Sequence, residues 1–186
     1  MADHENPRKT PWKTLNTKRI YDNAWITVDE HQVLNPSGNP GIYGKVHFKN
    51  LACGIIPLDE DHNTWIVGQY RYTLNDYSWE IPMGGVPVGS DPLVGAKREL
   101  KEETGITAEN WQNILQVHLS NSITDEVGVV FLAQNLTHGE TEFDDTEKLE
   151  IRKLPFTQLL EMVHNGEITD VLSVAGVLKL ANLLHL

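Results

Sequence analysis

Apolar residues recur along the chain in two patterns, a helical spacing and short continuous runs, and each pattern predicts a type of secondary structure. Leu93, Ala96 and Leu100 lie three and four residues apart, so they form one stripe of a helix expected over Pro92–Thr104. Short runs of β-branched and aromatic residues between turn residues predict strands. These runs are Trp25–Val28, Gln32–Leu34, Tyr43–Phe48, Leu51–Pro57, Trp65–Arg71, Ile114–Leu119, Val127–Ala133 and Leu149–Lys153.

The expected helix over Pro92–Thr104 has recognisable signals at both ends. Asp91 or Ser90 suits the N-cap, because a short polar side chain accepts a hydrogen bond from the first helical turn. Gly105 suits the C-terminal end, where a residue of left-handed conformation is common. A polar, glycine-rich loop over Gly84–Ser90 is expected to lead into this helix.

Two more helices are expected, over residues 157–165 and 170–184. Because strands and helices alternate irregularly, the pattern favours a mixed sheet flanked by helices over a doubly wound parallel sheet. We expect residues 1–49 to form one unit, with a loose tail over residues 1–16 followed by two or three antiparallel strands. Residues 50–186 then form a larger domain, and the small unit should pack on another surface because it buries little area alone.

Composition and charge exclude several classes of protein. The formal net charge is −11, and the 15 Lys and Arg residues are dispersed, so we expect no nucleic acid partner. The apolar runs are too short to span a bilayer, so we expect no membrane partner. The polar N-terminus lacks the apolar core of a signal peptide, which predicts a cytoplasmic protein. The single cysteine, Cys53, lies in an apolar run and is expected to be a buried thiol.

Three carboxylates on the expected helix are the first candidate chemistry. Glu99, Glu102 and Glu103 have the spacing i, i+3 and i+4, so they project from one face. Like charges in this arrangement repel, and a bridging cation such as Mg²⁺ or Mn²⁺ would remove that cost. Arg98 lies four residues before Glu102 and can hold that carboxylate in place. The same pattern also occurs on ordinary solvated helices, so the carboxylates alone do not establish a metal site.

The stretch from Gly84 to Ile106, GGVPVGSDPLVGAKRELKEETGI, resembles the Nudix signature. That signature is Gly, five residues, Glu, seven residues, then Arg-Glu-aliphatic-x-Glu-Glu-x-Gly-aliphatic. Every position matches except Ser90, which stands where the family has its first Glu. The resemblance implies an α+β Nudix fold, in which a mixed β-sheet is sandwiched between helices (αβα), here with a small N-terminal antiparallel β unit. It also implies a metal-dependent hydrolase that uses Mg²⁺ or Mn²⁺.

A second stretch resembles the ADP-ribose pyrophosphatase branch of this family. Trp79–Gly84 is similar to the branch's Glu-x-Pro-Ala-Gly segment, and Gln69–Arg71 is similar to its Gln-aromatic-Arg segment. The resemblance implies metal ligands and substrate contacts. The implied metal ligands are Glu99, Glu102, Glu103 and the main-chain carbonyl of Met83. The implied substrate contacts here are Arg71, Glu80, Gly84 and Gly85.

The N-terminal unit also resembles the branch, in which an antiparallel unit is exchanged across a homodimer and clamps the base. Trp25 and Tyr43 fall at matching places, so both are expected to bind substrate. The alternative is that both rings fill a core or a dimer interface. For catalysis the resemblance implies Arg98, Glu102 and an acidic loop in which Glu147 is the favoured general base and Asp145 the next candidate.

The resemblance implies hydrolysis of a nucleoside-diphosphate sugar, of the ADP-ribose, ADP-glucose or GDP-mannose type, to a nucleoside monophosphate and a sugar phosphate. Asn121 stands where the branch often has a proline associated with ADP-ribose preference, which weakens an assignment to ADP-ribose alone. One alternative is a hydrolase of dinucleoside polyphosphates or nucleoside triphosphates. Another is a catalytically weakened nucleotide-binding sensor, with Ser90 as the lesion.

Overall fold

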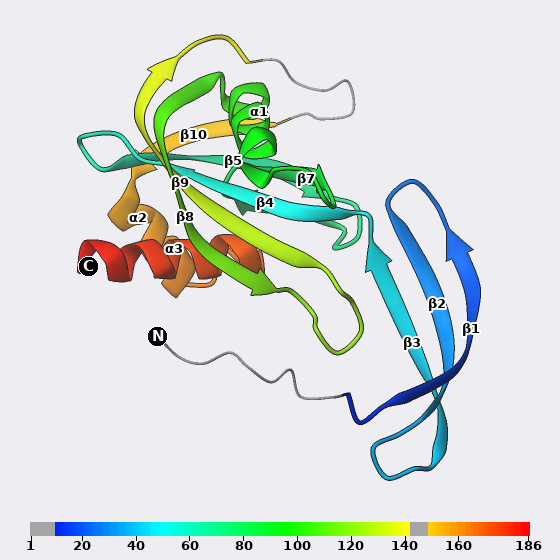
Figure 1. The fold of residues 1–186 in the computed structure, drawn as a ribbon. Coiled ribbons are helices and arrows are strands. Elements are labelled where there is room, and N and C mark those ends of the chain that lie inside the picture. Colours follow the sequence, from blue (N-terminus) through cyan, green and yellow to red (C-terminus); the bar gives the residue numbers. More distant parts are fainter. Residues whose placement is uncertain (1–9, 142–148) are drawn as a thin grey trace, which may run out of the picture. The chain divides into compact units, whose positions relative to one another are not determined.

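A computed structural model describes residues 10–141 and 149–186 of the chain (Figure 1). In these residues the backbone separates into two compact units. The smaller unit combines the chain up to Lys49 with the loop Ser120–Asp125, and the larger unit contains Asn50–Leu119 and Glu126–Leu186. The chain divides after Lys49, and the sequence did not foresee that Ser120–Asp125 belongs to the smaller unit.

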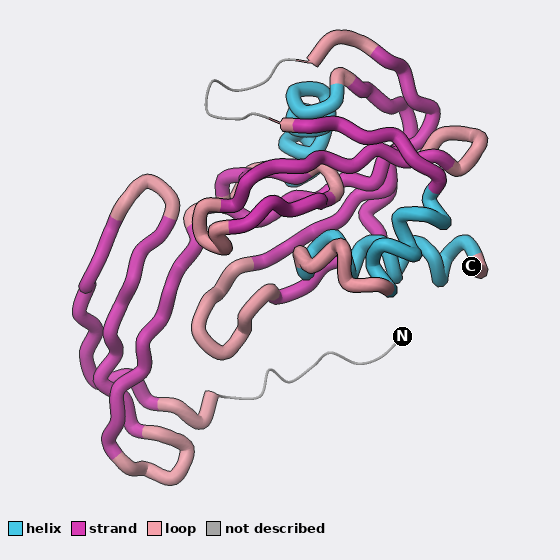
Figure 2. The backbone as a smooth tube through the Cα atoms, turned by 180° about the vertical axis from the view of Figure 1, so that it is seen from behind, coloured by secondary structure: helices cyan, strands magenta, loops and turns pink. Residues whose placement is uncertain are grey.

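The smaller unit is a three-stranded antiparallel sheet in the order β1-β2-β3 (Figures 1 and 2). Its strands are β1 (Lys13–Asp22), β2 (Ile26–Leu34) and β3 (Pro40–Phe48). The expectation of a loose tail to about residue 16 was wrong at its end, because Lys13 already pairs with Leu34 of β2. All ten residues of β1 are exposed, so main-chain pairing rather than an apolar pattern makes this segment a strand.

The larger unit contains a mixed sheet with the order β7-β4-β9-β8, in which β4 and β9 are parallel and the other neighbours are antiparallel. A three-stranded antiparallel sheet, β10-β5-β6, lies in the same unit. The strands are β4 (Asn50–Pro57), β5 (Asn63–Arg71), β6 (Asp76–Glu80), β7 (Met83–Pro87), β8 (Ile106–His118), β9 (Val127–His138) and β10 (Glu150–Pro155). The helices are α1 (Pro92–Thr104), α2 (Phe156–His164) and α3 (Val171–Leu184).

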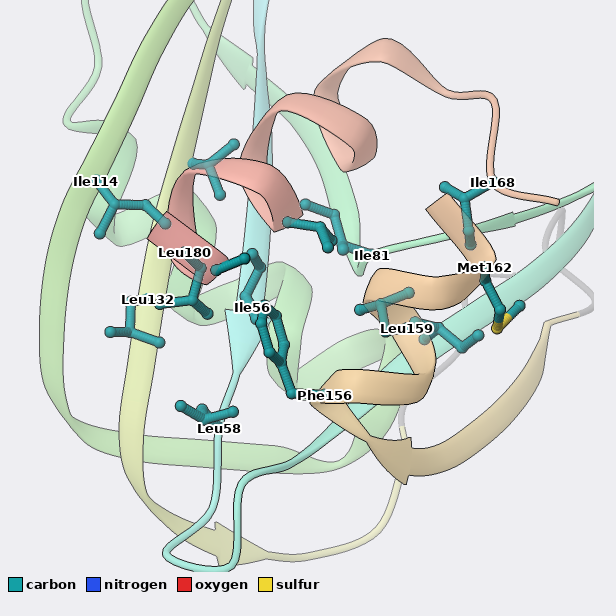
Figure 3. Close-up of a cluster of buried hydrophobic side chains, with 14 of the residues drawn as sticks. Ile56, Leu58, Ile81, Ile114, Leu132, Phe156, Leu159, Met162, Ile168 and Leu180 are labelled. Atoms are coloured by element: carbon teal, nitrogen blue, oxygen red, sulfur yellow. The ribbon is translucent and has the colours of Figure 1, made fainter. Parts of the chain in front are cut away.

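Alternation along β4 supplies one core on each face of the mixed sheet. Ile55 packs in a cluster with Leu100 of α1, whereas its neighbour Ile56 packs in a cluster with Leu159 and Leu180 of α2 and α3 (Figure 3). Successive side chains of a strand point to opposite faces, so two layers of helices can cover one sheet. The sandwich of helices around a mixed sheet is therefore the fold that the sequence predicted.

The ends of α1 follow the sequence signals. The Asp91 carboxylate accepts a hydrogen bond from the Leu93 N–H at 2.9 Å, and Pro92 occupies the first turn. Gly105 adopts a φ of 70°, and its N–H donates to the Lys101 carbonyl. The sequence had placed a loop over residues 84–90, but the first part of it is strand β7. This segment pairs with β4 as an antiparallel neighbour, and the turn begins only after Pro87.

Two other predictions concern the membrane and the cysteine. Within the described residues, no helix has the length and apolarity needed to cross a membrane. Cytoplasmic localisation stays a prediction. Cys53 is fully buried, as expected, and burial together with the nearby Glu99 charge raises the pKa of its thiol to about 12.

Candidate active site

Two carboxylates of α1, those of Glu99 and Glu103, face strand β7, and Glu103 is the more deeply buried. Glu103 is only 2% exposed, and its Oε2 accepts a hydrogen bond from the Met83 N–H at 3.0 Å. The Glu99 carboxylate lies directly over Gly84, since a Cβ added to Gly84 would be 2.0 Å from the Glu99 Cδ. Glycine is needed at this point because any side chain would displace Glu99.

Arg98 holds the two outer carboxylates of this face. Its Nη1 lies 2.8 Å from Glu102 Oε2, which is the contact that the spacing suggested, and its Nη2 donates to Glu99. The same Nη2 is 3.4 Å from the carbonyl of Gly85, so the guanidinium also reaches β7. Arg98 therefore fixes the positions of Glu99 and Glu102 relative to the glycines of the strand.

A second charged pair lies on the neighbouring strands. Arg71 of β5 donates from Nε to Glu80 Oε1 at 2.9 Å, and its Nη2 donates to Oε2, which makes the pair bidentate. Glu80 is 3% exposed, whereas the Arg71 side chain keeps 35% of its surface exposed. The hydrogen bond to Glu80, with added attraction from Asp170 and Glu103, raises the pKa of Arg71. The guanidinium is thus positively charged, and it interacts with the charge of Glu103 on α1.

The N-terminus of α3 fixes the segment that joins these two groups. Asp170 caps the helix by accepting from the Ser173 N–H at 2.7 Å. The Ser173 hydroxyl is fully buried and accepts a hydrogen bond from the Ile81 N–H at 3.1 Å. Sequence reasoning did not assign Ser173 a role in the site, although it lies in the first turn of the helix expected from residue 170. Burial, with the charge of Asp170, raises the pKa of Glu126.

The donor set fits a divalent cation that prefers oxygen ligands. Glu99, Glu102 and Glu103 contribute hard carboxylate oxygens, and β7 brings its main chain against two of them. Mg²⁺ is typically held by one or two carboxylates and completes its shell with water and substrate phosphate. In the described part of the chain, no three Asp, Glu, His or Cys side chains are already grouped as a metal cage.

The two rings expected to clamp a base are not brought together within one N-terminal unit. Trp25 immediately precedes β2, and its carbonyl accepts from the Lys49 N–H. Tyr43 pairs with His31, which lies six residues after Trp25. At about 3.3 Å per residue this separation is about 20 Å, too far for one purine to stack on both rings. Trp25 is 67% exposed, and the Tyr43 hydroxyl donates to the Ser122 carbonyl at 2.6 Å.

The two candidates for the general base, Glu147 and Asp145, lie outside the described residues. Ser90, at the position of the missing signature glutamate, forms a turn in which its N–H donates to the Pro87 carbonyl at 3.0 Å. The roles of all these residues stay predictions.

Two family models match the chain, one over its larger unit and one over its N-terminal unit. The family model described as the NUDIX domain matches residues 49–172, and the model described as the nucleoside diphosphate sugar hydrolase N-terminal domain matches residues 12–46. An ADP-ribose pyrophosphatase of Mycobacterium tuberculosis (strain ATCC 25618 / H37Rv) is 30% identical over 96% of this chain and 84% of its own length. An ADP-ribose pyrophosphatase of Bacillus subtilis (strain 168) is 29% identical, over 85% of this chain and 86% of its own.

One further relative by sequence and one solved structure are also similar to this chain. A methanol dehydrogenase activator of Bacillus methanolicus is 28% identical over 89% of this chain and 90% of its own. Among solved structures, an ADP compounds hydrolase superposes with a TM-score of 0.84 at 19% identity, covering 94% of each chain, which establishes the shared fold. With the signature helix, the fold and the family model in agreement, the chain belongs to the Nudix family and is a pyrophosphohydrolase.

Proposed function

We propose that this Nudix hydrolase splits the diphosphate bond of nucleoside-diphosphate sugars and releases a nucleoside monophosphate and a sugar phosphate. The observation that carries the proposal is the contact between α1 and β7, where Glu103 is buried against the Met83 N–H and Glu99 lies over Gly84. The match of residues 12–46 to the N-terminal domain of nucleoside diphosphate sugar hydrolases supports this substrate class.

The proposed metal ligands are the carboxylates of Glu99, Glu103 and Glu102, together with the Met83 carbonyl. Nudix hydrolases generally use divalent metal ions, and Mg²⁺ or Mn²⁺ suits this set of oxygen donors. Such ions, when bound, neutralise the charge of the diphosphate and lower the pKa of a coordinated water.

The residues of the chain then orient the reactants and accept the proton. Arg98 holds Glu99 and Glu102 in place, and Gly84 leaves room for the Glu99 carboxylate against the strand. Gly84 and Gly85 are proposed to contact the diphosphate through their main-chain groups. Arg71, which keeps a third of its side chain exposed, offers positive charge to a phosphate oxygen.

The attacking water needs a proton acceptor on the opposite side of the phosphorus from the leaving phosphate. Glu147 is the proposed general base and Asp145 the next candidate, while Glu102 is a helix carboxylate that can accept the same proton. Water attacks one phosphorus in line, the bridging oxygen bond breaks, and the other phosphate leaves with its sugar or nucleoside.

The N-terminal unit is proposed to bind the base and to join two chains. Trp25 is two-thirds exposed and offers a flat face for stacking on a purine. The unit also exposes large apolar side chains such as Leu15, Ile20 and Ile42. A homodimer with an exchanged N-terminal unit would cover them, and Tyr43 would then contribute to substrate binding only with residues of the second chain.

The test is hydrolysis of ADP-ribose, ADP-glucose, GDP-mannose and UDP-glucose, each with Mg²⁺, with Mn²⁺ and with EDTA. The proposal expects metal-dependent release of a nucleoside monophosphate from several of these compounds. A dinucleoside polyphosphate and a nucleoside triphosphate belong in the same panel, because faster turnover of either would replace the proposed substrate class. Tight binding without any turnover would instead indicate a nucleotide sensor and would direct attention to Ser90.

A further inference from the structure

The loop Ser120–Asp125 is joined to strand β3 by its main chain. The Val46 N–H donates to the Ile123 carbonyl at 2.9 Å, and the Asp125 N–H donates to the Val46 carbonyl at 3.2 Å. Val46 and Thr124 therefore form a parallel bridge. This loop leaves β8 and returns to β9, which are both strands of the larger unit, yet its contacts assign it to the N-terminal unit.

Asp125 is the centre of the attachment at the C-terminal end of the loop. Its Oδ2 lies 2.7 Å from Lys45 Nζ and 2.7 Å from His47 Nδ1, and its Oδ1 accepts from the Phe48 N–H at 3.1 Å. Partial burial opposes ionisation, but the hydrogen bonds from Lys45, His47 and Phe48 outweigh it and lower the pKa of Asp125 to about 2. One carboxylate thus binds three donors within residues 45–48 of β3.

Tyr43 attaches the other end of the loop. Its hydroxyl donates to the Ser122 carbonyl at 2.6 Å, and its ring lies edge-on to Trp12 with 5.3 Å between centroids. The loop is therefore held along β3 from Tyr43 to Phe48, by side chains at both ends and by the main chain at Val46.

The residue that follows this attachment belongs to the charged group of the active site. Glu126 immediately precedes β9, whose Gly128 lies against Leu172 at the start of α3, since a Cβ added to Gly128 would be 2.8 Å from the Leu172 Cδ1. Asp170 caps the same helix, and its charge acts on the partly buried Glu126. The same Asp170 charge acts on Arg71, which is paired with Glu80. Asp125 and Glu126 are neighbours in the chain, so the attachment at Asp125 fixes the main chain that leads into this charged group.

We propose that Asp125 is a positioning residue for substrate binding. It attaches the loop Ser120–Asp125 to β3 and thereby fixes the main chain that leads into Glu126. Tyr43 holds the same loop at a second point. The inference rests on the proposed function for the identity of the substrate, a nucleoside-diphosphate sugar. It assigns the Tyr43 hydroxyl to the loop.

Hydrogen exchange of the full-length protein tests the attachment without any substrate. In Asp125→Asn we expect the amides of Val46 and Asp125 to exchange at least about tenfold faster than in the wild type, because the loop opens more often. Tyr43→Phe removes a single hydroxyl and should accelerate exchange at the Ser122 end, which keeps the test decisive if Asp125→Asn fails to fold. Asp22→Asn and Tyr21→Phe are matched controls, because both positions lie in the same unit and neither touches the loop.

Steady-state kinetics on the best nucleoside-diphosphate sugar tests the role in binding. We expect Asp125→Asn to raise KM about tenfold while kcat stays within about threefold of the wild type, because the groups on α1 are unchanged. Asp125→Glu, which restores the charge, should recover part of the affinity. Both control variants should retain wild-type KM.

Each outcome decides the inference. Unchanged exchange in Asp125→Asn would show that the loop is not held by this residue. Faster exchange with wild-type KM, or a fall in kcat at constant KM, would show that the attachment does not serve substrate binding. If the wild type binds ADP-ribose but does not hydrolyse it, the proposed function fails. Calorimetry then decides the inference, because we expect the Kd for ADP-ribose to be about tenfold higher in Asp125→Asn than in the wild type. A wild type that binds no nucleoside-diphosphate sugar overturns both.

Discussion

At the scale of single residues, the site depends on close contacts between the carboxylates of α1 and the main chain of β7. The Glu99 carboxylate lies against the Cα of Gly84, and Glu103 reaches the Met83 N–H of the same strand. Arg98 then holds Glu99 from the other side. Each carboxylate is fixed by a neighbour, so the geometry of the face does not rely on the flexibility of glutamate side chains.

Gly84→Ala tests this close approach. The new methyl group would occupy the position of the Glu99 carboxylate, which must swing away, so we expect kcat to fall by about a hundredfold. The fold should persist, because the displaced group is the flexible end of a side chain. Gly41→Ala is the control, since a Cβ at that strand position meets no atom within 4 Å. Wild-type turnover in Gly84→Ala would mean that the position of Glu99 does not matter for the reaction.

Arg71→Ala tests the buried pair with Glu80. The substitution leaves a carboxylate that is 3% exposed without its guanidinium partner. We expect the free energy of unfolding to fall by about 2–3 kcal/mol, at the low end for a broken buried pair because Arg71 itself is one-third exposed. Urea denaturation gives the measurement, and Arg71→Ala combined with Glu80→Gln should recover part of the loss. Equal stability of Arg71→Ala and the wild type would contradict this account of the pair.

At the scale of elements, α1 packs unusually close to β7. A Cβ added to Gly95 would lie 2.1 Å from the Val86 Cγ2, and both residues are buried. We expect Gly95→Ala to destabilise the protein by about 1–2 kcal/mol, because overpacking outweighs the better helix propensity of alanine. Val94→Ala, at a neighbouring exposed position of the same helix, should not destabilise it. A Gly95→Ala protein more stable than the wild type would show that α1 can move away from β7 at little cost.

The attachment of loop Ser120–Asp125 to β3 should depend on pH through Asp125. Its pKa of about 2 in the folded protein lies below the ordinary value of 3.8, so the ionised carboxylate stabilises the fold above about pH 4. This contribution is lost as the pH falls through about 2. We therefore expect the difference in unfolding free energy between the wild type and Asp125→Asn to be full at pH 5 and to shrink toward pH 2. A difference that stays constant over this range would contradict the assigned contacts.

The elements that the sequence predicted well are those whose signals are local. The boundaries of α1 follow from Asp91, Pro92 and Gly105, each of which acts on its own helical turn. Strand β1 has no such signal, since its residues are exposed on both faces and only pairing with β2 orders them. Strand β7 was mistaken for a loop because its glycines, which permit the approach of Glu99, are also typical of turns.

At the scale of the whole molecule, the candidate site was predictable in part. The motif identified the carboxylates and Arg98 because they share one helix. Long-range contacts carry no comparable pattern, so the hydrogen bond from Ile81 to Ser173 and the attachment of Asp125 to β3 emerged only from the structure. The register of β2 and β3 separates Trp25 from Tyr43 within one chain, and their binding of the base stays a prediction.

The central claim is that the carboxylate face of α1 holds the metal that hydrolysis requires. The most direct measurement is turnover of the preferred nucleoside-diphosphate sugar by Glu103→Gln, over a range of Mg²⁺ concentrations, beside Glu109→Gln as an exposed control on β8. The account predicts that Glu103→Gln loses at least about a thousandfold in kcat at every Mg²⁺ concentration, while Glu109→Gln behaves as the wild type. Activity of Glu103→Gln within about threefold of the wild type would contradict the assignment of this helix as the metal site.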